Sequence, residues 1–224
     1  MVLELFKGGG DEGLAVTSAR IAEMLVDCRH TFDLAFGALL DGVEPASVGK
    51  EVRKTDVGVN KAERAVRREL LVHVSVRGTT ANIPMVLASM SVVKDAERIG
   101  DYAKNIWDLA AEGIDLSDAP DREVLSGWRD RVSAAIGEVS RAFVERDTES
   151  AHRLLKEFDG LLDECDQIIS AQINSTGSPR DAVPRALLFR YVKRIVAHLM
   201  NVLTSLVMPL DRLDYYDEKK ADRD

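Results

Sequence analysis

Residues 94–106 form the most informative stretch of the chain and read Lys94-Asp95-Ala96-Glu97-Arg98-Ile99-Gly100-Asp101-Tyr102-Ala103-Lys104-Asn105-Ile106. Glu97 and Asp101 are four positions apart. On a helix their carboxylates therefore share one face, where two like charges cost about 0.2–0.5 kcal/mol. A glycine inside a helix costs about 1 kcal/mol relative to alanine and is usually retained where another backbone packs closely. The segment predicts a helix that a second helix crosses at Gly100, with two carboxylates on one face that need a counter-charge.

Apolar residues recur at steps of three and four on both sides of this segment, which is the spacing of amphipathic helices. We predict helices over about 14–40, from Pro45 to about 76, and from Pro84 to about 112, each pair separated by Gly- and Pro-containing breaks. Three further helices are expected on the apolar stripes at 124–143, 154–169 and 187–210. No window alternates with a period of two, so no sheet is expected. The predicted fold class is all-α, with six helices in two antiparallel three-helix-bundle repeats.

The chain divides near its midpoint at the loop 113–120. We predict a flexible leader at 1–13, a first repeat at 14–112, a linker at 113–120, a second repeat at 121–213 and a charged tail at 214–224. Two constant offsets suggest an internal duplication. Asp56-x3-Asn60-x2-Glu63 aligns with Asp159-x3-Asp163-x2-Asp166, whereas Arg98-Ile99 and Asn105 align with Arg194-Ile195 and Asn201.

Composition excludes several classes of protein. The 224 residues carry a net charge of −8, with a pI near 5.1 and no basic stripe apparent in the sequence, so nucleic-acid binding is disfavoured. Only two cysteines are present, 137 positions apart, which argues against a disulfide scaffold or a thiolate zinc site. The N-terminus lacks the features of a signal peptide, and no apolar run reaches the ~20 residues of a membrane span. A cytoplasmic location is expected, with membrane association only through a partner.

The run Glu97-Arg98-Ile99-Gly100-Asp101, followed by Asn105-Ile106, resembles the signature of the PhoU family of phosphate-signalling proteins. The resemblance implies a cytoplasmic, non-enzymatic regulator of phosphate uptake or signalling that docks onto a phosphate transporter's ATPase or a sensor kinase. It also implies metal binding, with Glu97 and Asp101 as first-repeat ligands and Asp56 and Asn60 opposite them. The metal would be a divalent or trivalent ion, with iron, manganese, magnesium and zinc all open and a metal-free protein also open.

Two regions depart from the family pattern. In the second repeat, Lys193 and Ala197 replace the two carboxylates, so that half is expected to have lost its cluster, with Lys193 neutralising Asp159, Asp163 and Asp166 as an internal ion pair. The loop before the third helix, 77–84, also lacks the family's usual residues. The chain therefore resembles a divergent member.

Alternative interpretations remain open from the residues alone. Lys94, Arg98 and Lys104 could pair with Glu97 and Asp101 as an ordinary solvated face. The protein could then be a metal-free helical adaptor whose acidic face contacts a basic partner. A ferritin-like di-iron protein is a weaker alternative, since Glu149-x-x-His152 and Asp27-x-x-His30 approach the required spacing. A homodimer is plausible.

Overall fold

The computed structural model describes residues 12–217, and over this range the chain is helical and has no β-strand. The long helices are α2 (Glu12–Leu40), α3 (Pro45–Arg77), α4 (Ile83–Ala111), α5 (Arg122–Glu145), α6 (Thr148–Ile173) and α7 (Pro179–Val207). Three short 3-10 helices lie between or after them: η1 (Gly78–Thr80), η2 (Leu210–Arg212) and η3 (Tyr215–Asp217). The predicted all-α fold is confirmed, and most helix ends lie within a few residues of the predicted positions.

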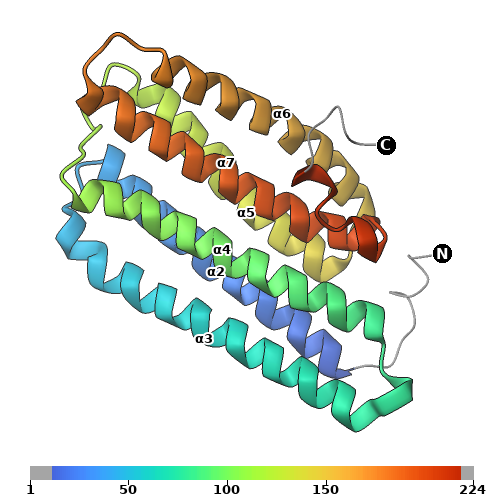
Figure 1. Ribbon diagram of the computed structural model, residues 1–224. Helices are drawn as coiled ribbons and strands as arrows, with labels where there is room; N and C mark the ends of the chain where they lie inside the picture. Colours follow the sequence, from blue (N-terminus) through green and yellow to red (C-terminus); the bar gives the residue numbers. More distant parts are fainter. Residues whose placement is uncertain (1–11, 218–224) are drawn as a thin grey trace.

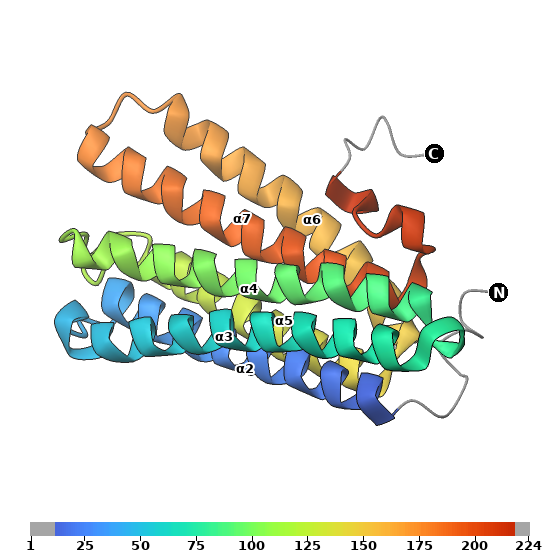
Figure 2. The same cartoon turned by 60° about the horizontal axis from the view of Figure 1, so that its bottom comes forward.

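The six helices form two antiparallel three-helix units that lie side by side (Figures 1 and 2). In the first unit α2, α3 and α4 pack against one another, and in the second α6 and α7 are closely paired. The units meet where α2 packs on α5 and α4 packs on α7. As a result α3 and α6 lie on the outside, and α5 contacts α2 more extensively than it contacts the other two helices of its own unit.

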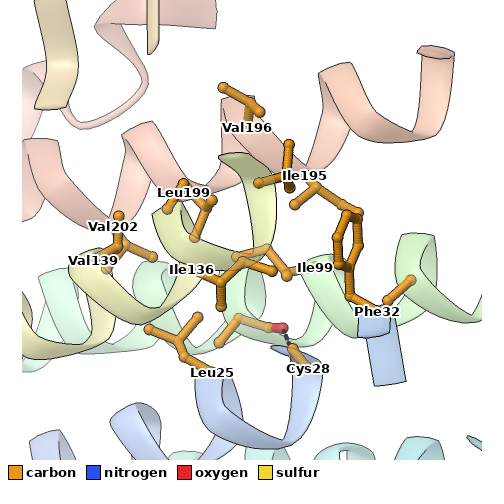
Figure 3. Close-up of a cluster of buried hydrophobic side chains, with 14 of the residues drawn as sticks. Leu25, Cys28, Phe32, Ile99, Ile136, Val139, Ile195, Val196, Leu199 and Val202 are labelled. Atoms are coloured by element: carbon orange, nitrogen blue, oxygen red, sulfur yellow. Dashed lines mark hydrogen bonds between the residues drawn. The ribbon is translucent and has the colours of Figure 1, made fainter. Parts of the chain in front are cut away.

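One continuous apolar core runs through both units. Figure 3 shows Leu25 and Phe32 of α2 gathered with Ile99 of α4, Ile136 of α5 and Leu199 of α7. All five side chains are fully buried. Because residues from both units fill the same space, burial of this apolar surface stabilises the two repeats together.

Local sequence signals explain where the helices begin. The Asn82 side chain accepts a hydrogen bond from the Met85 N–H at the start of α4, and Pro84 follows in the first turn. Asp147 and Ser178 cap α6 and α7 in the same way. Gly42 and Gly113 have φ values of 66° and 87° in the turns after α2 and α4, a conformation that glycine adopts without strain.

The segments outside the helices are more ordered than the sequence suggested. In the predicted linker, the Leu116 N–H donates to the Leu39 carbonyl at 2.8 Å and the Leu116 side chain is buried. Part of the predicted tail at 214–224 forms η3, which packs against α7 with Tyr216 half-buried against the core. The predicted flexible leader lies largely outside the described residues, as does the tail beyond residue 217.

None of the helices between residues 12 and 217 combines the length and apolar content that crossing a membrane requires.

Candidate functional site

The 94–106 segment lies in the middle of α4, at the point where α2 and α3 cross it. A Cβ placed on Gly100 would lie 3.2 Å from the Cys28 sulfur of α2 and 3.6 Å from a Val59 methyl of α3. The Cys28 thiol donates a hydrogen bond to the Ala96 carbonyl at 3.3 Å, and burial raises the pKa of this thiol so that it stays protonated. The close helix crossing predicted at Gly100 is therefore present.

Three of the four predicted metal-site residues bring carboxylates into one neighbourhood. Burial, followed by the negative charges of Glu97 and Asp56, raises the pKa of the Asp101 carboxyl. Glu97 is only 7% exposed, whereas Asp101 and Asp56 are half-buried. The α3–α4 edge therefore holds an acidic cluster, which we define as Asp56, Glu63, Glu97 and Asp101.

Asn60 lies beside this cluster, but its side chain is engaged locally. Its Nδ2 donates to the Asp56 carbonyl one turn earlier in α3, at 3.0 Å. Glu63 is not among the ligands that the PhoU resemblance implies, but it follows Asn60 by three positions and therefore shares its helix face. Glu63 is 8% exposed and contributes buried negative charge, which the neutral Asn60 cannot.

Basic side chains supply positive charge to the acidic cluster. The Lys94 ammonium lies 2.6 Å from Glu97 and 3.9 Å from Glu63, so it joins α4 to α3. Arg67 pairs with Glu63 at 3.0 Å, and Arg98 lies 3.9 Å from Asp101. The ion-pair interpretation is thus correct for Lys94 and Arg98.

For Lys104 the ion-pair interpretation is wrong, because its ammonium lies 3.5 Å from Asp108 of the following turn. The interpretation as a solvated face also fails for Glu97, which is buried.

The candidate ligands have the right chemistry for a hard cation, but they are not arranged around a common point. All the predicted donors are oxygens, which suit magnesium, manganese or iron. Among the described residues, however, no three His, Cys, Asp or Glu side chains are arranged to hold a metal ion. The position between Glu63 and Glu97 is taken by the Lys94 ammonium.

The second repeat places a lysine where the first has a carboxylate. Lys193 of α7 contacts Asp166 of α6 at 2.5 Å. By the two sequence offsets, these positions correspond to Glu97 and Glu63, the pair that Lys94 bridges in the first repeat. The predicted internal ion pair is confirmed for Asp166. In the second repeat, the positive charge beside this carboxylate is therefore supplied by the lysine of α7.

A buried polar network joins the two units where α4 packs on α7. The Asp95 carboxylate accepts hydrogen bonds from His198 Nδ1 at 2.8 Å and from Asn201 Nδ2 at 3.1 Å. Arg194 Nη2 lies 3.2 Å from His198 Nε2, on the other side of the ring. Asp95, His198 and Asn201 are each less than a tenth exposed.

Sequence reasoning missed this network because Asp95 and His198 are 103 positions apart. The 96-residue offset was a usable signal, since it aligns Tyr102 with His198. These two rings stack, with centroids 5.8 Å apart. Equivalent residues of the two repeats therefore meet at the contact between α4 and α7.

The residues considered for a di-iron centre are not brought together. Glu149 and His152 are exposed at the start of α6, where His152 Nδ1 contacts the Thr148 carbonyl. His30 is also exposed and pairs with Glu51 of α3 at 2.7 Å. The arrangement matches none of the inward-facing ligands of a ferritin-like site.

Comparison with known proteins agrees with the motif. Residues 21–110 match the family model described as the PhoU domain, and this span contains the whole acidic cluster. The likeness to the PhoU domain covers 90 of the 224 residues, all in the first half of the chain. The crystal structure of PhoU from Pseudomonas aeruginosa has the same fold, with a TM-score of 0.75 and 19% sequence identity over 90% of this chain and 98% of that chain. No protein with a curated description matches the chain.

The residues matched by the PhoU model lie in the half of the chain that keeps the motif carboxylates. The match ends before α5. The second half has the fold but carries Lys193 and Ala197 at the motif positions.

Proposed function

We propose that the chain regulates phosphate uptake or phosphate signalling in the cytoplasm by binding a partner protein, either the ATPase of a phosphate transporter or a sensor kinase. The observation that carries this proposal is the PhoU domain over residues 21–110, with Glu97 and Asp101 at its motif positions. The long, continuous helices support it, because their outer faces offer extended surfaces for a protein partner.

The proposal includes a metal-dependent step at the acidic cluster. Glu97, Asp101 and Asp56, with Asn60 beside them, would hold a divalent or trivalent cation such as iron, manganese, magnesium or zinc. Such an ion supplies positive charge that links α3 to α4 and orders this edge for the partner. The raised pKa of Asp101 supports the proposal, because it is caused first by burial and then by the nearby negative charges of Glu97 and Asp56, which a bound cation would offset.

A metal-free adaptor is the second candidate, and a specific contact favours it. Lys94 already bridges Glu97 and Glu63 across the two helices. An incoming cation would compete with this ammonium for the same carboxylates. If Lys94 prevails, the chain would bind its partner through helix faces alone.

Elemental analysis of untagged protein purified without chelators tests the metal step. We expect a near-stoichiometric metal in the wild type and its loss in Glu97→Ala/Asp101→Ala. A matched control, Asp159→Ala/Asp163→Ala, removes two acidic residues from α6 and should keep the metal. Lys94→Met removes the competing cation and should bind added Mn²⁺ more tightly than the wild type does.

Helicity, measured by circular dichroism, must be unchanged in each variant for the comparison to hold. A wild type that contains no metal and takes up no added cation, together with an equally inert Lys94→Met variant, would establish the adaptor instead. Co-purification with the organism's own phosphate-transporter ATPase or sensor kinase, with and without Mn²⁺, then tests the partner.

A further inference from the structure

The outer helix α3 has one side available for a partner along its whole length. It packs against α2 and α4; Figure 1 shows it at the edge of the molecule, and in Figure 2 its remaining side faces the viewer. With 33 residues, it is about 50 Å long. This outward side is long enough to contact another helix over several turns.

The outward side of α3 carries a regular row of basic and apolar side chains. Steps of four and three residues connect its members, which we name the basic stripe: Lys50, Lys54, Val57, Lys61, Arg64, Arg68 and Leu71. The expectation that the chain has no basic stripe was therefore wrong for this helix, because the stripe becomes visible only when one side of α3 is singled out. All seven are exposed, including Val57 at 48% and Leu71 at 61%. This alternation of four and three is the heptad spacing of a face that packs along another helix.

The five cations of the basic stripe have no ion pair with any residue in the described part of the chain. Positions such as Arg64 and Arg68 are one turn apart, so their charges repel and weaken the helix by a few tenths of a kcal/mol per pair. On α6, by contrast, Glu157, Glu164 and Asp166 each pair with a basic residue. Within the described residues, the positive charge of the basic stripe is therefore not balanced by any ion pair.

The two outer helices also differ in net charge. α3 contains eight Lys and Arg against four Asp and Glu, a balance of +4, in a chain whose net charge is −8. The corresponding helix α6 has two Lys and Arg against six Asp and Glu, a balance of −4. A partner attracted to α3 is therefore acidic, the opposite sign from the partner that the acidic cluster alone would suggest.

Carboxylates border the basic stripe on both sides and limit the shape of its occupant. Glu51 and Glu69 each follow a stripe residue by one position, so they lie roughly 100° around the helix, where they pair with α2. Asp56 and Glu63 lie on the opposite border, at α4. A flat anionic surface such as a membrane would also meet Glu51, Asp56 and Glu69, which are exposed or half-buried, whereas a single rod of negative charge would meet the cations alone.

We propose that the basic stripe of α3 binds an acidic α-helix of a partner protein. Carboxylates on that helix pair with the lysines and arginines, and small or apolar residues between them pack against Val57 and Leu71. This inference rests on the proposed function, because it names the surface and the chemistry of the partner expected there. It places that partner directly beside the acidic cluster.

A pair of designed peptides tests the binding of an acidic helix. The first is a fluorescein-labelled helical peptide of 28 residues with glutamates at alternating steps of three and four, and the second has the same composition with the glutamates spread around the helix. By fluorescence anisotropy, the full-length wild type should bind the first peptide at least tenfold more tightly than the second. Raising the salt concentration from 50 to 300 mM should weaken that binding.

Charge-reversal variants locate the binding surface. Lys54→Glu/Lys61→Glu/Arg64→Glu should lose at least tenfold in affinity for the first peptide. The control, Arg141→Glu/Lys156→Glu/Arg190→Glu, changes three exposed cations elsewhere by the same total charge and should bind as the wild type does. Both variants should keep the helicity and melting temperature of the wild type.

Equal affinity for the two peptides, or an equal loss in both triple variants, would overturn the proposal. So would stripe-dependent binding to vesicles of phosphatidylglycerol and phosphatidylcholine without binding to the first peptide. Peptide binding by a protein that holds no metal would leave this proposal standing while the metal step fails. Metal binding without peptide binding would support the metal step and overturn the proposal for the basic stripe.

Discussion

At the scale of single residues, Gly100 shows how one position joins three helices. The absence of a side chain lets Cys28 of α2 and Val59 of α3 approach α4 at the same level. The cost of glycine in a helix, about 1 kcal/mol, is offset by the contacts that this approach allows. The same crossing brings α3 close enough for Lys94 to reach Glu63.

Gly100→Val should lower the free energy of unfolding by about 1–3 kcal/mol, because the new side chain overpacks the crossing. Gly58→Val is the matched control, since a Cβ at Gly58 of α3 meets nothing within 4 Å. That variant should stay within about 0.5 kcal/mol of the wild type. Urea denaturation followed by circular dichroism measures both values, and equal stability of the two variants would refute this account of Gly100.

Asp121 gives a prediction that depends on pH. Arg185 of α7 donates to both of its carboxylate oxygens, at 2.6 and 3.1 Å, and thereby lowers the pKa of Asp121 below its usual 3.8. A lowered pKa in the folded state means that this pair stabilises the fold above the unfolded pKa. The contribution is lost as the pH falls through the folded pKa.

Asp121→Asn should therefore cost about 0.5–1 kcal/mol at pH 7, a modest value because the Asp121 side chain is 41% exposed. The difference from the wild type should shrink as the pH falls from 5 towards 2. Thermal or urea unfolding across this range measures it, with the exposed Asp118→Asn as a control. A difference that stays constant with pH would show that the ion pair is not its source.

At the scale of elements, the contact between α4 and α7 combines apolar packing with a buried polar network. Asp95 holds two donors from α7 at once, His198 and Asn201. A buried carboxylate without such donors would be strongly unfavourable, so removing one member leaves the other groups with unmet hydrogen bonds. The network therefore favours one register of α7 along α4.

Asp95→Ala and His198→Ala should each lower the free energy of unfolding by about 1–3 kcal/mol. Because both lose the same contact, the double variant should show a coupling energy above about 1 kcal/mol. The exposed pair Arg153 and Glu138, 2.9 Å apart, is the comparison and should couple by less than that. A double-mutant cycle in urea measures both energies; additive effects at Asp95 and His198 would rule the coupling out.

At the scale of the whole molecule, the two repeats do not have separate cores. Ile136 of α5 is fully buried in the same cluster as Leu25 of α2 and Ile99 of α4 (Figure 3). The interfaces α2–α5 and α4–α7 are continuous with the interior of each repeat. Loss of packing in one repeat should therefore be felt in the other.

Ile136→Ala should lower the free energy of unfolding by about 2–5 kcal/mol in a single cooperative transition. Native-state hydrogen exchange should show the same loss of protection in the cores of α4 and α7. Ile173→Ala, at a position on α6 that is 72% exposed, should change stability by no more than about 0.5 kcal/mol. A loss confined to α5, α6 and α7 would show that the repeats unfold independently.

Local sequence patterns were enough to predict the helices, the loop between the halves and the acidic motif. These features depend on residues three or four positions apart and on local signals such as Pro45, Asn82 and Gly113. All of these interactions are between residues close together in the sequence, so the sequence pattern is sufficient to predict them. The loss of the second-repeat carboxylates was predictable for the same reason, because Lys193 falls at a fixed offset from Glu97.

The contacts of these side chains, by contrast, depend on how the helices pack. The sequence did not reveal that Lys94 reaches Glu63 on another helix or that Asp95 contacts His198 across the repeats. Nor did it reveal that the linker is hydrogen-bonded to the end of α2 and that η3 packs against α7. The sequence also contains the basic residues of α3, but it does not show which side of that helix faces outward. Each of these facts depends on how helices distant in sequence pack together, which is set by burial of the shared core and not by local spacing.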